Sequence, residues 1–230
     1  QLLQQIVEYE PEQHVHPAID YVDDKLVYMY SPEGINESVM VTAEKLYPVM
    51  REDGQLKIHF AEKSFLVKPE FWLVNQNHLL QIKRLVTHMY RNGKIKKEDC
   101  SQLFDTLLSK YTYYVYFVDD MWYYIVTCWT LGTFIFIIFQ AYPPLIPKGP
   151  RDVGKTTLET LLSKTCFHAT TPTAKSTEAD IKRTIHHARA TMIFDEQQYL
   201  SDTKRYGEIV SLIEAGCEKP INSSCLRCAP

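Results

Sequence analysis

The segment Gly149-Pro-Arg-Asp-Val-Gly-Lys-Thr156 decides the predicted fold, because it fits the pattern G-x-x-x-x-G-K-[ST] at every fixed position. The apolar pair Leu145-Ile146 precedes it as an expected short strand, and a helix is expected over residues 156–165. Glycines in such a loop let backbone N–H groups turn inward around phosphate oxygens. The N-terminus of the following helix adds partial positive charge. The pattern therefore predicts a phosphate-binding loop.

Every residue of this loop is a candidate for nucleotide binding. Lys155 reaches the terminal phosphates as a point charge, and Thr156 offers its hydroxyl to Mg²⁺. Asp152 is unfavourable here, since its carboxylate repels phosphate unless it points away or meets Arg151. The predicted nucleotide-binding residues are Gly149, Pro150, Arg151, Asp152, Val153, Gly154, Lys155, Thr156 and Thr157.

A second motif lies forty residues beyond the loop lysine. The apolar run Thr191-Met-Ile-Phe194 leads directly into Asp195-Glu196. An acidic residue at the carboxyl end of a buried parallel strand lies beside a phosphate loop. We therefore expect Asp195 to hold Mg²⁺, usually through water, and Glu196 to polarise an attacking water molecule. The predicted metal cofactor is Mg²⁺.

The chain alternates between predicted strands and helices from Leu145 onward. After the helix at 156–165, we expect a strand at 166–170, a helix at 177–189, a strand at 190–194 and a helix at 204–215. This rhythm is typical of α/β proteins in which helices flank a parallel sheet. Residues 113–230 are accordingly predicted to form one α/β domain with a parallel sheet flanked by helices.

The residues before this domain show different patterns. Short β-rich runs, including Ala18–Val22 and Lys25–Tyr30 around an Asp23-Asp24 turn, predict a small β-rich module over residues 1–70. Apolar residues at helical spacing then predict a helical linker over residues 71–112, with one helix starting near Lys97.

The two motifs resemble the Walker A and Walker B motifs of P-loop ATPases. The glutamate beside the aspartate is similar to that of the additional-strand catalytic-glutamate group, which includes AAA+ proteins and helicases. Upstream, Trp129-Thr-Leu-Gly-Thr133 and Phe139-Gln-Ala-Tyr-Pro143 resemble archaeal and phage ATPases linked to primase–helicase systems. The resemblance covers residues 110–228. It implies a P-loop ATPase domain over residues 113–230, with ATP and Mg²⁺ as cofactors and catalytic roles for Lys155 and Glu196.

The resemblance also implies a function and partners. It implies a DNA helicase or translocase subunit in replication of a cell, virus or mobile element, with single-stranded DNA as the favoured partner and assembly into a ring. A regulatory ATPase that remodels protein and a decayed nucleotide-binding module are the alternatives. In the resembled group a sensor strand and an arginine finger follow, and no such strand is recognised before Pro230. We therefore expect the ATPase domain to be incomplete in this chain.

Composition limits the remaining possibilities. The chain of 230 residues is 45% hydrophobic with a formal net charge of −3, which excludes a wholly disordered protein and a general basic surface. Six unevenly spaced cysteines favour reduced thiols in the cytoplasm. The uncharged run 121–147 fits a buried helix on the sheet better than a membrane span, because threonines and Gln140 interrupt it. Zinc is not favoured, because Cys217, Cys225 and Cys228 lack a fourth local ligand.

Overall fold

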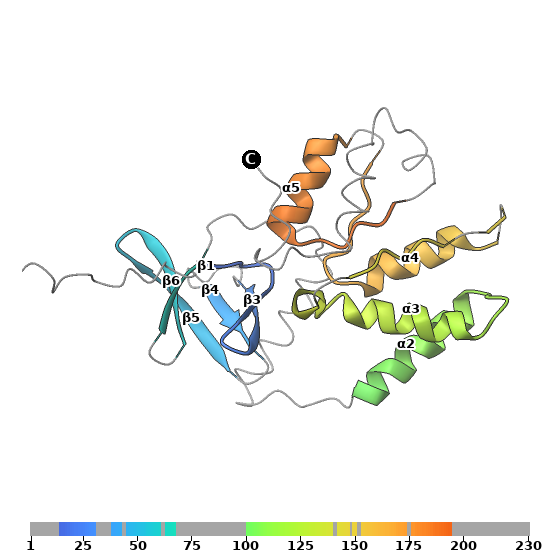
Figure 1. The fold of residues 1–230 in the computed structure, drawn as a ribbon, viewed down its shortest axis with the longest axis horizontal. Helices are drawn as coiled ribbons and strands as arrows, with labels where there is room; N and C mark the ends of the chain where they lie inside the picture. The colour runs from blue at the N-terminus through green and yellow to red at the C-terminus, as the bar shows by residue number, and fades with distance from the viewer. Residues whose placement is uncertain are drawn as a thin grey trace, which may run out of the picture. The chain divides into compact units, whose positions relative to one another are not determined.

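The chain is a mixed α/β protein, shown as a computed structural model in Figure 1. The structure describes residues 14–30, 38–42, 45–60, 63–67, 100–139, 142–147, 149–150, 153–173 and 176–194. Within these residues it contains a seven-stranded sheet and four α-helices. The chain divides into two compact units, residues 1–71 and 72–230.

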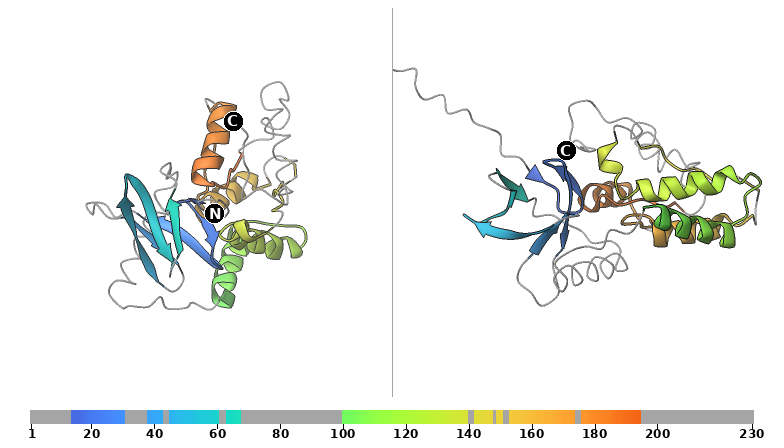
Figure 2. Two further views of the ribbon diagram at one scale, coloured as in Figure 1. Left: turned by 60° about the vertical axis from the view of Figure 1, so that its left-hand side comes forward. Right: turned by 90° about the horizontal axis from the view of Figure 1, so that it is seen from below.

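The sheet lies in the first unit and is almost entirely antiparallel. Its order is β1-β7-β6-β5-β4-β3-β2, and only β1 and β7 pair in parallel. Figure 2 shows the strands from two further directions. The strands are β1 His14–Val15, β2 Asp20–Val22, β3 Lys25–Tyr30, β4 Ser38–Val41, β5 Leu46–Glu52, β6 Gln55–Phe60 and β7 Lys63–Val67.

Two tight turns set the register of this sheet. Asp23 and Asp24 have φ of 51° and 59°, and Asp53 and Gly54 have φ of 51° and 80°. Two successive residues with positive φ make the turn whose twist matches that of the adjoining strands. The hairpin predicted around Asp23-Asp24 is therefore confirmed, with Val22 opposite Lys25.

A contact between distant strands shows that the sheet curls. Lys63 Nζ on β7 lies 2.7 Å from Asp23 Oδ1 in the β2–β3 turn. In a flat sheet, β7 and β3 would be about 19 Å apart, four strand spacings. Curvature lets one face enclose a core, which consists of Val15, Val27, Val49, Ile58, Phe60, Phe65 and Val67.

The second unit contains the helices. They are α2 Cys100–Tyr114, α3 Met121–Gly132, α4 Lys155–Thr165 and α5 Glu178–Ala188, with the 3₁₀ turn η1 Phe136–Ile138. Helix α5 starts where predicted because Thr177 and Asp180 form a capping box, each side chain bonding the other residue's N–H. The helices predicted at 156–165 and 177–189 are confirmed, whereas residues 71–99 of the predicted linker and the helix predicted at 204–215 lie outside the described residues.

The predicted parallel sheet is seen only as one short contact. Met192 and Thr170 form an isolated parallel bridge, in which Ile193 N donates to Thr170 O at 2.8 Å and Thr170 N to Thr191 O at 3.0 Å. His168, with φ of 41°, interrupts the extended run expected over 166–170. The parallel direction predicted for segments 166–170 and 190–194 is therefore present, but neither forms a full strand.

The strand predicted at Leu145-Ile146 is wrong, because residues 142–147 pair with no strand in the described part of the chain. Pro143 and Pro144 lack the N–H groups that a strand ladder requires. The carbonyl of Pro143 instead accepts a hydrogen bond of 2.8 Å from Trp129 Nε1. This bond fixes the segment that leads to the loop against α3 without making it a strand.

The uncharged run is not one buried helix, which corrects the expectation for 121–147. Helix α3 ends at Gly132, and the chain turns back so that Tyr142 donates a hydrogen bond to Trp129 O. Gly132 permits this return, because a Cβ there would overlap the Tyr142 ring. Of the helices among the described residues, none has the length and apolar character needed to cross a membrane.

Candidate phosphate-binding site

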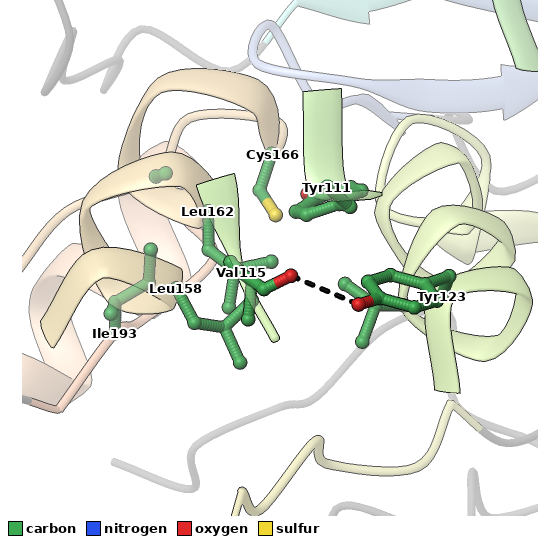
Figure 3. Close-up of a cluster of buried hydrophobic side chains, with 9 residues drawn as sticks. Tyr111, Val115, Tyr123, Leu158, Leu162, Cys166 and Ile193 are labelled. Atoms are coloured by element: carbon green, nitrogen blue, oxygen red, sulfur yellow. Dashed lines mark hydrogen bonds between the residues drawn. The ribbon is translucent and has the colours of Figure 1, made fainter. Parts of the chain in front are cut away.

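A buried cluster holds α4, the helix that follows the predicted loop. Leu158 and Leu162 of α4 pack in the same cluster as Val115, just after α2, and Tyr123 of α3 (Figure 3). The Tyr123 hydroxyl donates a hydrogen bond of 3.0 Å to Val115 O. The cluster consists of Tyr111, Val115, Tyr123, Val126, Leu158, Leu162, Cys166, Ala169 and Ile193.

The Tyr111 hydroxyl joins three helices at the other end of this cluster. It lies 2.7 Å from Thr130 Oγ1 on α3 and 3.0 Å from Thr165 Oγ1 on α4. Burial raises the pKa of Tyr111, so the hydroxyl stays neutral and keeps its proton for a hydrogen bond. The C-termini of α3 and α4 are therefore held together beside α2.

The loop reaches α4 through a glycine with left-handed backbone geometry. Gly154 has φ of 87° and ψ of 17°, and its carbonyl accepts the first helical hydrogen bond from Leu158 N at 3.0 Å. A Cβ at Gly154 would meet nothing within 4 Å, so the requirement for glycine is conformational. A Cβ at Gly149 would lie 3.1 Å from Val153 Cγ2, which shows that the two arms of the loop approach each other.

Lys155 is the first residue of α4 and folds back over the loop. Its Nζ donates a hydrogen bond of 2.9 Å to the carbonyl of Gly149. The first turn of α4 contains no acidic residue, and its N-cap residue is Gly154, which has no side chain to cap the helix. The lysine charge and the helix dipole therefore act together at one end of α4, an arrangement that favours an anion.

Of the other predicted site residues, four lie in the described part of the chain. Thr156 and Thr157 are exposed in the first turn of α4, and Pro150 and Val153 are exposed in the loop. Arg151, Asp152, Asp195 and Glu196 lie outside the described residues. The segment that leads to Asp195 is described through Phe194 and runs beside residues 167–170.

No metal site is visible in the part of the chain that the structure describes, where no three His, Cys, Asp or Glu side chains gather. Cys217, Cys225 and Cys228 lie outside that part. Cys128 is an exposed thiol and Cys166 a buried one, and burial raises the pKa of Cys166 to about 12. A thiol with such a pKa remains protonated and does not act as a nucleophile.

Sequence reasoning found the loop but missed the residues that position it. Tyr111 lies among several tyrosines of the same stretch. Residue type does not distinguish it from Tyr113, which is 80% exposed. Helical spacing with Leu107 and Leu108 was the only available indication that Tyr111 faces inward. Its hydrogen-bond partners, on two later helices, were not predictable.

Comparison of the chain with protein-family models, with curated proteins and with solved structures finds no significant match.

Proposed function

We propose that the chain carries an ATP-hydrolysing motor domain that acts on DNA, preferably single-stranded. The observation that carries the proposal is the arrangement of Gly149, Gly154 and Lys155 at the start of α4. A left-handed glycine followed at once by a lysine on the first helical turn supplies inward backbone donors and one cationic side chain. These are the groups that hold the phosphates of a nucleoside triphosphate.

The proposed chemistry assigns a role to each group. The loop amides and Lys155 stabilise negative charge on the transferring phosphoryl group, which requires Lys155 to leave the Gly149 carbonyl. Thr156 would hold Mg²⁺ together with Asp195, and the metal would neutralise charge on the phosphates. Glu196 orients the attacking water. Self-association into a ring supplies the arginine that such ATPases take from a neighbouring subunit.

Steady-state ATP hydrolysis with and without single-stranded DNA tests this function. We expect DNA to stimulate hydrolysis and Glu196→Gln to abolish it while ATP still binds. Activity that is indifferent to DNA would instead support a protein-remodelling ATPase. Binding without turnover would indicate a nucleotide-binding module that has lost hydrolysis.

A paired substitution tests the phosphate loop itself. Lys155→Ala removes the cation beside the loop, whereas Lys164→Ala removes an exposed lysine from the last turn of the same helix. We expect Lys155→Ala to weaken Mg²⁺–ATP binding at least tenfold, since a hydrogen bond to a charged group contributes about 1.5–3 kcal/mol. Equal affinities for the two variants in calorimetry would contradict the assignment of the loop.

A further inference from the structure

An exposed tryptophan lies at the same end of the helical unit as the phosphate loop. Tyr111 holds the C-termini of α3 and α4 together by bonding Thr130 and Thr165, and both helices run from that point toward the opposite end. The N-terminus of α3 and the phosphate loop therefore share that opposite end, as Figure 1 shows. Trp122 lies there, in the first turn of α3, and is 48% exposed.

The flank of α3 that bears Trp122 is also the flank along which the chain approaches the loop. Trp122 and Trp129 are seven residues apart and so lie on one stripe of the helix. Trp129 Nε1 bonds Pro143 O, which places the segment that leads to Gly149 on this stripe. That segment starts near the C-terminus of α3 and ends at the N-terminus of α4, so it runs toward Trp122.

The opposite flank of α3 is occupied by α2. Tyr124 lies about 200° around the helix from Trp122, and its ring stacks on Phe104 of α2 with a centroid distance of 6.4 Å. Trp122 is therefore turned away from α2. Apolar side chains at the loop itself, Ile146 and Val153, are also about half exposed.

The charged side chains at this end differ in sign between the start of α3 and the phosphate loop. Asp119 and Asp120 precede α3, and Asp119 Oδ1 accepts a hydrogen bond of 2.9 Å from Met121 N. Their carboxylates repel phosphate, whereas the N–H groups at the edge of a purine base are suitable donors to them. An anion is therefore favoured near Lys155 and disfavoured near the start of α3.

We propose that the Trp122 indole is a stacking platform for the purine base of a nucleotide whose phosphates bind the Gly149–Thr156 loop. This inference rests on the proposed function, because it requires phosphate binding at that loop. Bases stack on aromatic side chains, and replacing the aromatic residue by alanine removes the stacking energy and lowers the affinity for the ligand. Trp122 is thus a base-binding residue, which the sequence motif of the phosphate loop does not include.

The test compares two ligands that differ in the base. Calorimetry with the full chain measures the affinity of the non-hydrolysable ATP analogue AMP-PNP and of tripolyphosphate, each with Mg²⁺. The variants are Trp122→Ala, Trp122→Phe, which keeps an aromatic ring, and Tyr113→Ala as control. Tyr113 is an equally aromatic residue, 80% exposed, on the side of α2 opposite its buried residues.

We expect Trp122→Ala to weaken AMP-PNP binding about tenfold and to leave tripolyphosphate binding unchanged. Trp122→Phe should bind AMP-PNP with an affinity close to that of the wild-type chain. AMP-PNP should also quench tryptophan emission in the wild-type chain more than in Trp122→Phe. Equal loss for both ligands, or the same AMP-PNP affinity in Trp122→Ala and Tyr113→Ala, would overturn the inference and leave the phosphate loop standing. Failure of the wild-type chain to bind tripolyphosphate would overturn the proposed function as well.

Discussion

Replacing Gly154 by alanine isolates the contribution of one backbone conformation. A Cβ at Gly154 would meet nothing within 4 Å, so the substitution creates no steric overlap. The cost comes from φ of 87°, which is about 1–2 kcal/mol for a residue with a Cβ. The loss of about 0.4–1 kcal/mol of unfolded-state entropy offsets part of it. We therefore expect the free energy of unfolding to fall by about 1 kcal/mol.

Gly54→Ala is the matched control for this substitution. Gly54 has φ of 80° and also meets nothing within 4 Å, but it lies in the β5–β6 turn of the first unit. All three tryptophans lie at or beyond residue 72, so tryptophan emission follows the second unit alone and circular dichroism follows both. Only Gly154→Ala should shift the denaturation curve that tryptophan emission records.

The two glycine variants should also differ in ligand binding. Alanine at 154 favours negative φ, and relaxation of the loop to that geometry would turn its N–H groups away from the phosphates. We expect at least a tenfold loss of tripolyphosphate affinity in Gly154→Ala and wild-type affinity in Gly54→Ala, measured by calorimetry. Wild-type stability and affinity in Gly154→Ala would refute the assignment of a left-handed loop glycine.

Three further substitutions and treatments test the helical unit. Tyr111→Phe removes two hydrogen bonds to threonine hydroxyls, one buried and one partly buried, and should lower the free energy of unfolding by about 1–3 kcal/mol in denaturant titrations. Burial lowers the pKa of His168, so the unfolded chain binds more protons than the folded one. The free energy of unfolding should therefore fall as pH drops below about 6.5, and His168→Gln should reduce this dependence. A thiol reagent should modify exposed Cys128 quickly and buried Cys166 only on unfolding, as mass spectrometry of the labelled peptides would show.

The local elements of this protein were largely predictable. The Asp23-Asp24 hairpin follows from turn chemistry, since two successive aspartates between β-rich runs tolerate positive φ. Helix α5 follows from its capping box, and α4 from the motif that precedes it. In each case the decisive interactions join residues a few positions apart, so the sequence contains them in full.

The failures of prediction lie where distant residues compete with local preference. Leu145-Ile146 has the composition of a strand. However, the two preceding prolines lack N–H groups, and the Trp129 indole donates to the carbonyl of Pro143. The uncharged run 121–147 suggested one buried helix until the return of Tyr142 over Gly132 divided it. Strand pairing and chain reversal depend on partners that local periodicity cannot identify.

The sequence by itself determined the chemical character of the candidate site. A glycine and a lysine at fixed spacing before a helix are sufficient to predict inward N–H groups and one cation, because both effects are local. Only the tertiary structure decided what surrounds the loop. The Tyr111 hydrogen bonds and the buried cluster bring the N-termini of α3 and α4 to one end of the helical unit, so Trp122, in the first turn of α3, lies at the same end as the loop. That arrangement arises from packing between helices far apart in the chain.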